Sequence, residues 1–276
     1  MRVLLGLVRR LATAPLFRRL TSVGPLLRLS FSLRATLVRE RARFVRNELR
    51  RSPVTATYRL RSSGVAVTVR HHTGDVMVLD EIFSQGEYEL PERIALAEDL
   101  DAVDLGANIG LFGAWLLGVS PGARIVGYEP DPGNAAVHRA TIAANGLEDR
   151  WRLVEAFAGT RAGATRFTAG LHALSREGEG IEVAVVDALP DLFDADFVKI
   201  DIEGAEWPIL ADPRFKELRA DVVVLEYHTQ GAPGPDPARA AEDALSAAGF
   251  ECVHAARKPA YGAGIVWGRR QPQSRP

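Results

Sequence analysis

The sequence contains very little cysteine and no pattern typical of a structural metal site. Cys252 is its single cysteine, so an internal disulfide is excluded. No CxxC pair or Cys/His cluster is present, which excludes a structural zinc site of the usual spacing. Because disulfides mark oxidising compartments, we expect the protein to work in a reducing compartment, the cytoplasm.

Long apolar runs are also absent from the start of the chain. In the first 50 residues, arginines interrupt the apolar stretches after six or seven residues, whereas a membrane-spanning helix needs about 20 apolar residues. Arg9, Arg10, Arg18 and Arg19 stand where a secretory signal would have its apolar centre. We therefore expect neither a membrane span nor a secretory signal in this segment.

The charge is unevenly distributed, although the net charge is only −1. Residues 1–53, the basic arm, hold 13 arginines against Glu40 and Glu48, and the rest of the chain is acidic. Leucine and arginine alternate in the arm as in an amphipathic helix, with breaks near Pro15 and Pro25. Such a helical arm can lie on an anionic membrane surface or pack on the acidic body, and the sequence leaves both alternatives open. Nothing in it resembles a base-stacking module, so we expect no nucleic-acid partner.

Beyond the basic arm, the pattern predicts an α/β fold. The composition, 47% apolar and 25% charged, is that of an ordinary globular domain. Residues 54–99 predict a small β element and a connecting helix, residues 100–270 form the main domain, and residues 271–276 are a tail. The alternation of strand and helix in the main domain predicts a doubly wound, mostly parallel sheet. The last two strands predict an antiparallel hairpin at one edge of that sheet.

Some local features lead to more detailed expectations. The alternation of apolar and polar residues at 54–78 predicts β structure throughout, with His71 and His72 in an exposed loop. Residues 152–158 (RLVEAFA) predict one strand, and residues 164–186 predict a hairpin.

Two strand ends carry a carboxylate close to glycine, at the edge where a doubly wound sheet binds its ligand. The motif DLGANIG at 104–110 runs from a strand through a turn into a helix, and its glycines let a ligand approach the backbone closely. It lacks the GxGxxG spacing of a dinucleotide site, because Asn108 and Leu111 occupy the second and third glycine positions. Glu129, in GYEPDP, is placed to accept hydrogen bonds from both hydroxyls of a ribose.

A third strand end carries acidic residues at alternate positions. The motif KIDIEGAE at 199–206 places Asp201 and Glu203 close to each other and to Lys199, so each group perturbs the pKa of its neighbours. Such perturbation is more frequent at functional sites than elsewhere. Glu203 and Glu206 are alternatively first-turn charges that complement a helix dipole, an interpretation that we favour for Glu206.

The next strand supplies a candidate base. His228, in VVVLEYH, lies two residues after Glu226 and therefore points to the same face of the strand. A histidine beside a carboxylate can titrate near neutrality and accept a proton, although a strand-end histidine without a role is an equal alternative. Asp201 is the other candidate base or orienting group. Asp201, Glu203 and Glu226 could together bind Mg²⁺, but the sequence places no further oxygen ligands, and we predict no metal.

These motifs together resemble those of the FkbM family of S-adenosylmethionine-dependent methyltransferases, over roughly residues 75–230. VKIDIEGAE carries the resemblance most specifically. It implies a class I Rossmann-like methyltransferase fold with a seven-stranded sheet, S-adenosylmethionine as cofactor, and methyl transfer to a hydroxyl oxygen. The acceptor implied is a small hydroxylated metabolite, such as a sugar or a polyketide-like product. The cofactor-binding residues that it implies are Asp104, Gly106, Asn108, Gly110 and Glu129, and our catalytic candidates are Asp201, Glu203 and His228.

Two other functions remain as alternatives. An NAD-dependent dehydrogenase or epimerase would require the GxGxxG turn that this chain lacks. A methyltransferase-like scaffold without activity would be expected to have lesions in the cofactor loop, whereas Asp104, Gly106, Gly110 and Glu129 are all present. The dipeptide Trp207-Pro208 is not expected from the resemblance.

Overall fold

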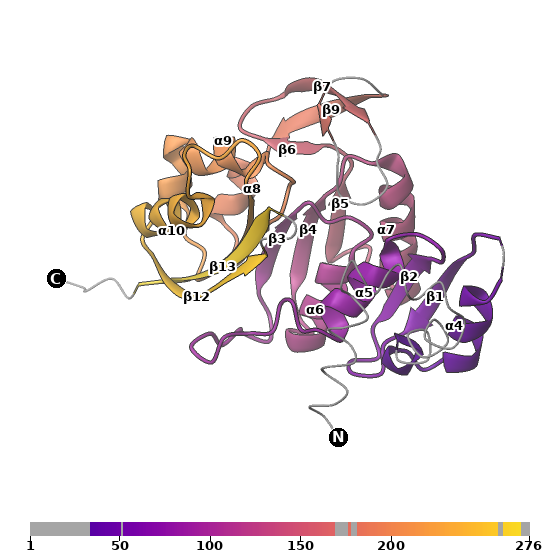
Figure 1. Ribbon diagram of the computed structural model, residues 1–276. Helices are drawn as coiled ribbons and strands as arrows, with labels where there is room; N and C mark the ends of the chain where they lie inside the picture. Colours follow the sequence, from indigo (N-terminus) through magenta and orange to yellow (C-terminus); the bar gives the residue numbers. More distant parts are fainter. Residues whose placement is uncertain (1–33, 51, 169–175, 178–180, 259–261, 272–276) are drawn as a thin grey trace.

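The structure is a computed structural model that describes residues 34–50, 52–168, 176–177, 181–258 and 262–271 (Figure 1). Most of the basic arm, and with it the expected contact with a membrane or with the acidic body, lies outside the described residues. Among the helices that are described, none has the length and apolar character needed to cross a membrane.

A seven-stranded sheet forms the centre of the molecule, in the order β12-β13-β11-β10-β3-β4-β5. Its strands are β3 (Asp101–Leu105), β4 (Arg124–Tyr128), β5 (Trp151–Val154), β10 (Phe197–Ile200), β11 (Val222–His228), β12 (Phe250–Lys258) and β13 (Ala263–Arg270). The strands from β11 to β5 pair in parallel, and β13 pairs antiparallel with both β11 and β12. The predicted fold class and the antiparallel edge hairpin are therefore confirmed. The winding reverses between β3 and β10, so the ligand site is expected at the carboxyl ends of these two strands.

Side chains along the strands point alternately to the two faces of this sheet, so that each face carries an apolar core. Helices cover both of these cores. One core contains Phe197, Val222 and Val224, and the other contains Val198, Val223 and Leu225. The first core is covered by α5 (Asp75–Phe83), α6 (Leu111–Val119) and α7 (Pro132–Asn145). The second is covered by α8 (Leu189–Phe193), α9 (Glu206–Ala211), the 3₁₀ helix η2 (Pro213–Glu217) and α10 (Pro237–Ala247) (Figure 1).

A small N-terminal element packs beside α7. It comprises η1 (Ala35–Leu37), α4 (Arg41–Glu48), β1 (Thr55–Arg59) and β2 (Ala66–Arg70), and the two strands pair antiparallel as predicted. Asn145, at the end of α7, donates to and accepts from the backbone of Ala66. These hydrogen bonds join the element to the main domain. The domain boundaries expected from the sequence, at residues 53, 99 and 270, stay a prediction.

Two expectations for this element are wrong. The β pattern does not continue to residue 78, because α5 begins at Asp75. His71 is not exposed but fully buried, between Glu48 of α4 and the hydroxyl of Tyr58, which is 2.6 Å from its Nε2. The burial comes from the packing of α4 over β1 and β2, which the local pattern does not reveal.

A second, four-stranded sheet lies next to β5, in the order β6-β9-β7-β8. Its strands are β6 (Phe157–Gly159), β7 (Gly163–Thr168), β8 (Arg176–Glu177) and β9 (Ile181–Asp187). The predicted hairpin corresponds to the antiparallel pairing of β7 with β9. The single strand expected at 152–158 is wrong, because the backbone turns at Ala156, whose N–H donates to the carbonyl of Val154. The chain thereby passes from one sheet to the other.

A buried lysine joins the carboxyl ends of β3 and β10. Lys199 is 3% exposed, and its Nζ lies 2.9 Å from Asp104 Oδ1 and 3.5 Å from Asp201 Oδ2. It also donates to the carbonyl of Gly106, at 2.9 Å. Burial by itself lowers the pKa of Lys199, but the two aspartates outweigh it and hold the pKa above its ordinary value. The ammonium therefore keeps its charge and holds both loops.

The loop after β3 passes directly against the loop after β10. A Cβ at Gly106 would lie 1.8 Å from the carbonyl oxygen of Asp201, and Gly106 has a φ of +84°. Gly110 has a different neighbour, because a Cβ there would lie 2.6 Å from the ring of His138. That ring is fully buried, and burial lowers the pKa of His138 to about 4. A side chain at either position would clash with the protein, so the packing of this loop requires both glycines independently of any ligand.

Replacing Lys199 by Met should destabilise the fold by about 3 kcal/mol or more, because it leaves the carboxylate of Asp104 buried without its cation. Lys216→Met is the matched control, since Lys216 is exposed and its loss should change stability by less than about 0.5 kcal/mol. Denaturant unfolding of both variants measures the difference. Equal stability would show that Asp104 does not need a cationic partner.

The fold should also lose stability in mild acid because of His138. Its pKa of about 4 in the folded protein lies below the ordinary value of 6.5, so the unfolded chain binds the proton more tightly. The stability is complete above the ordinary pKa and falls as the pH drops towards 4, by about 2 kcal/mol between pH 7 and pH 5. His138→Leu should reduce this slope, and His254→Leu, at an exposed position, should not. Identical slopes in all three proteins would contradict the assignment.

Candidate active site

The first half of the site is the loop between β3 and α6, together with Glu129 after β4. Gly106, Asn108 and Gly110 all have left-handed backbone conformations, with φ of +84°, +48° and +86°. The turn that they form brings the N–H of Asn108 to the carboxylate of Glu129, at 2.8 Å from Oε2. Oε1 accepts from the N–H of Asp131, also at 2.8 Å. Burial raises the pKa of Glu129 to about 7, against the hydrogen bonds that lower it.

Glu129 and Asp104 differ in what they offer to a ligand. Oε2 of Glu129 keeps an acceptor position besides its backbone hydrogen bond, whereas Oε1 also accepts a long hydrogen bond, 3.4 Å, from the side-chain amide of Asn134. A ribose hydroxyl could donate to Oε2 directly and to Oε1 in place of that long contact. Asp104 is 1% exposed and is paired with Lys199. Its structural contribution is to anchor the lysine that holds the loop.

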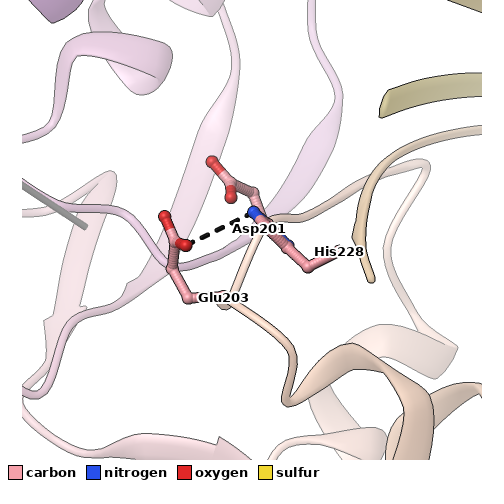
Figure 2. Close-up of side chains that lie close together, drawn as sticks. All are labelled: Asp201, Glu203 and His228. Carbon is pink, nitrogen blue, oxygen red and sulfur yellow. Dashed lines mark ion pairs between the residues drawn. The ribbon is translucent and has the colours of Figure 1, made fainter. Parts of the chain in front are cut away.

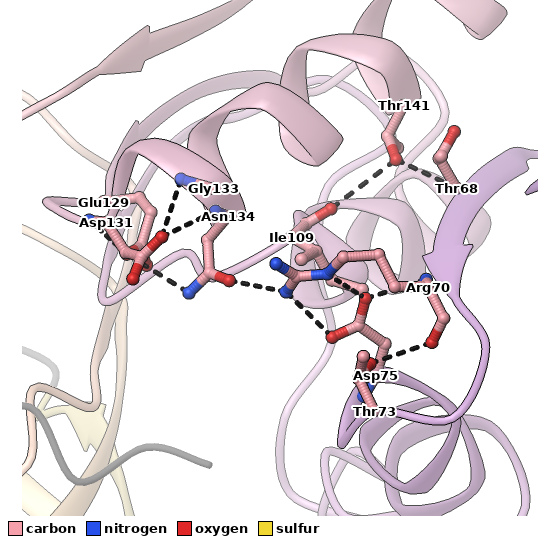
Figure 3. A network of polar contacts seen from close by, with 10 residues as sticks. All are labelled: Thr68, Arg70, Thr73, Asp75, Ile109, Glu129, Asp131, Gly133, Asn134 and Thr141. Carbon is pink, nitrogen blue, oxygen red and sulfur yellow. Dashed lines mark hydrogen bonds and ion pairs between the residues drawn. The ribbon is translucent and has the colours of Figure 1, made fainter. Parts of the chain in front are cut away.

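Glu129 is supported from the N-terminal element by a chain of polar contacts (Figure 3). The side-chain amide of Asn134, in the first turn of α7, donates to Glu129 Oε1 at 3.4 Å and accepts from Arg70 at 2.6 Å. Arg70 in turn forms a bidentate pair with Asp75, at 2.8 and 3.0 Å. Sequence reasoning missed Arg70 and Asn134, because residues 64 positions apart carry no local signal of this contact.

The second half of the site is a cluster of three side chains from β10 and β11. One oxygen of Asp201, one oxygen of Glu203 and one ring nitrogen of His228 all lie within 4.8 Å of one another (Figure 2). His228 Nε2 is 3.3 Å from Glu203 Oε2. Glu203 has a φ of +57°, and Gly204 after it has a φ of +99°. The turn formed by these two residues directs the Glu203 carboxylate back towards the strand ends. The structure brings the three catalytic candidates together, and their roles stay a prediction.

A fourth acidic residue, Glu206, holds His228 from behind. It lies in the first turn of α9, as expected, but it is fully buried rather than a surface charge. Oε1 accepts from the backbone N–H of His228 at 2.7 Å and lies 3.2 Å from its Nδ1, and Oε2 accepts from the N–H of Gly204 at 2.7 Å. The hydrogen bond at Nδ1 leaves Nε2 turned towards Glu203 and Asp201. A helix-dipole role alone is therefore the wrong interpretation of Glu206.

The carboxylates around the cluster change the pKa values of its members. Burial raises the pKa of Glu203 to about 7, and the charge of Asp201 adds to the rise. Burial by itself lowers the pKa of His228, but the hydrogen bond that its ring donates to Glu206 and the charges of Asp201 and Glu203 raise it to about 9. The expected titration of His228 near neutrality is thus wrong for the free protein, in which its imidazole holds a proton at pH 7.

Two aromatic residues complete the surroundings of the cluster. The indole N–H of Trp207 donates to the carbonyls of His228 and Gln230, at 3.0 Å each, and so holds the end of β11. Pro208 lies in the first turn of α9, where a proline is tolerated. Tyr88 is 3% exposed, and burial together with the charge of Asp201 raises the pKa of its hydroxyl well above the ordinary value.

Comparison with known proteins gives a family for the chain. Residues 104–252 match the model of the methyltransferase FkbM domain. No curated protein sequence matches the chain. Among solved structures, a methyltransferase FkbM from Methylobacillus flagellatus is similar, with a TM-score of 0.48 and 18% identity over 71% of this chain and 53% of that chain. The present chain thus spans about half the length of that protein.

Two further solved structures are similar at the same level. M. jannaschii TYW2 in complex with AdoMet has a TM-score of 0.43 and 16% identity, over 80% of this chain and 87% of that chain. A precorrin-6y C5,15-methyltransferase from Geobacter metallireducens has a TM-score of 0.41 and 22% identity, over 63% of this chain and 83% of that chain.

The family match spans more than half of the chain, and it begins at Asp104, near the end of β3 and just before the loop described above. It includes Glu129 and the cluster at the ends of β10 and β11. The chain belongs to the FkbM family of methyltransferases, which use S-adenosylmethionine as the methyl donor.

Proposed function

We propose that the protein transfers the methyl group of S-adenosylmethionine to a hydroxyl oxygen of a small hydroxylated acceptor, such as a sugar or a polyketide-like product. The observation that carries this proposal is the cluster of Asp201, Glu203 and His228 at the strand ends, next to the 104–110 loop. The cluster is polar, and Asp201 and Glu203 are 24% and 26% exposed. A hydroxylated molecule can therefore reach it.

The residues present fit the methyl donor. Glu129 offers two carboxylate oxygens to a ribose, in a position between the N–H groups of Asn108 and Asp131. The acidic surroundings favour a sulfonium cation, although they do not speed the transfer, because the positive charge disperses in the transition state. When bound, S-adenosylmethionine supplies an electrophilic methyl group and leaves as a neutral thioether.

The acceptor side requires two contributions from the protein. A hydroxyl oxygen must be held in line with the methyl carbon, about 3 Å away. Its proton must also be removed or its pKa lowered, because a neutral hydroxyl is a weak nucleophile. Asp201 and Glu203 can orient the hydroxyl by accepting its hydrogen bond, and Lys199 holds Asp201 in place at 3.5 Å.

The test of the reaction type is transfer of a ¹³C-labelled methyl group to a panel of sugars and polyphenolic or polyketide-type alcohols. We expect the label on oxygen, which the carbon chemical shift distinguishes from nitrogen or carbon. Label on nitrogen or carbon would overturn the proposal.

Titration calorimetry with S-adenosylmethionine, its demethylated product and NAD separates the methyltransferase from the two alternative functions. Binding of NAD alone favours a dehydrogenase. Binding of none of the three ligands by the folded protein favours an inactive scaffold.

Affinity for S-adenosylmethionine should rise with pH through Glu129. Ribose hydroxyls donate to the ionised carboxylate, and its pKa is about 7, so binding should strengthen about ten-fold between pH 6 and pH 8. Glu129→Gln should weaken binding at pH 8 by about 1 to 3 kcal/mol and remove most of the pH dependence. Glu148→Gln, at an exposed position, is the control. Unchanged affinity of the Glu129 variant would remove this residue from the site.

Replacing His228 by Ala should lower kcat by about a hundred-fold, because the imidazole holds the carboxylate of Glu203, 3.3 Å away, beside the acceptor. The affinity for S-adenosylmethionine should stay nearly unchanged, because the imidazole belongs to the acceptor side. His254→Ala, at an exposed position, should keep full activity. If the His228 variant turns over at the rate of the wild type at every pH, the residue has no part in the reaction.

A further inference from the structure

We infer that Asp201, Glu203 and His228 hold a divalent transition-metal cation, with Mn²⁺ as its representative, which takes the acceptor hydroxyl as a further ligand. The chemical role of this cation rests on the proposed function, whereas its binding does not. The sequence predicts no metal because it places no oxygen ligands beyond Asp201, Glu203 and Glu226, and the structure instead brings His228 to Asp201 and Glu203.

The spacing of the three side chains suits one cation. One ligand atom from each lies within 4.8 Å of the others, and bonds of about 2.1 Å to a common centre place ligand atoms about 3 to 4 Å apart. Asp201 and Glu203 are each about one quarter exposed, so small rotations of their side chains close the remaining gap. One imidazole and two carboxylates favour Mn²⁺, Fe²⁺ or Zn²⁺ over Mg²⁺ and Ca²⁺, which prefer oxygen ligands alone.

The strongest observation is the buried carboxylate behind the imidazole. A histidine that binds a metal through one nitrogen usually donates the other N–H to a carboxylate, which sets the tautomer and the ring orientation. Glu206 does this for His228: it is fully buried, it lies 3.2 Å from Nδ1, and it also accepts the backbone N–H of the same residue at 2.7 Å. Nε2 is thereby directed at Glu203, 3.3 Å away.

The charges around the cluster of Asp201, Glu203 and His228 also favour a cation. Asp104, Asp201, Glu203 and Glu206 surround it with four carboxylates. Lys199 contacts two of them, Asp104 and Asp201, and the protonated His228 contacts the other two, Glu203 and Glu206. Four negative charges therefore face two positive ones. A divalent cation that replaces the proton of His228 adds one further positive charge between Asp201 and Glu203.

The cation would activate the acceptor as a Lewis acid, which lowers the pKa of a hydroxyl that it binds. The O–H bond breaks and the proton passes to solvent at the exposed edge of Asp201 and Glu203. The oxygen then forms a bond to the methyl carbon, while the carbon–sulfur bond breaks and its electron pair stays on sulfur. Binding of the cation also displaces protons from its ligands, so affinity should fall in acid.

The test is titration of chelator-treated, full-length protein with MnCl₂, without S-adenosylmethionine or acceptor, followed by electron paramagnetic resonance and calorimetry. We expect one bound Mn²⁺ per chain, displaced by Zn²⁺ and not by equimolar Mg²⁺. Asp201→Asn, Glu203→Gln and His228→Gln should each weaken binding at least ten-fold, and Glu206→Gln by about 10- to 100-fold. Circular dichroism checks that every variant is folded.

The matched control is His254→Gln, which should bind Mn²⁺ like the wild type because this histidine is exposed. An unchanged signal of free Mn²⁺ at high protein concentration would overturn the inference, as would variants that bind like the wild type. Full methyl transfer by the chelator-treated protein overturns the activating role of the cation and leaves the O-methyltransferase proposal intact. Bound Mn²⁺ in a protein that transfers the methyl group to no hydroxyl overturns the O-methyltransferase proposal and leaves the cation site intact.

Discussion

The site depends first on one buried charge, the ammonium of Lys199. It contacts Asp104 at the end of β3, the carbonyl of Gly106 in the loop that follows, and Asp201 after β10. A single residue thus connects the half of the site proposed for the methyl donor with the half proposed for the acceptor. Because the backbone at Gly106 passes against the carbonyl of Asp201, the two loops cannot shift independently. A transfer reaction that needs close placement of two reactants benefits from this rigidity.

Around this lysine, the protein keeps more negative than positive charge. The neighbouring carboxylates raise the pKa of His228, and the charge of Asp201 adds to the rise that burial causes in the pKa of Glu203. A cationic ligand relieves the same excess of negative charge. The sulfonium of the donor and a divalent cation would each do so, in different halves of the site. This charge distribution would favour cations and polar acceptors over a dinucleotide with its two phosphates.

Much of the fold and of the candidate site could be predicted from the sequence, because strand periodicity and the residues at strand ends are local properties of the chain. The motifs at 104–110 and 199–206 predict which residues meet at the sheet edge, and the structure brings Asp201, Glu203 and His228 together. The burial of a side chain could not be predicted in this way, because it depends on the packing of elements that are far apart in the chain. Glu206 is a helix-start glutamate in the sequence, and only the packing of α9 against β11 makes it a partner of His228. For the same reason His71 could not be recognised as a core residue.

The contact between Arg70 and Asn134 couples the N-terminal element to the candidate site. Arg70 belongs to the N-terminal element, whereas Asn134 supports the carboxylate expected to bind the ribose. Any ligand that orders Glu129 therefore also stabilises the packing of β2 on α7, and by reciprocity the docking of that element strengthens ligand binding. The physical unit of this methyltransferase is therefore larger than its family motif, because Arg70, which helps to support the expected donor site, precedes that motif in the chain.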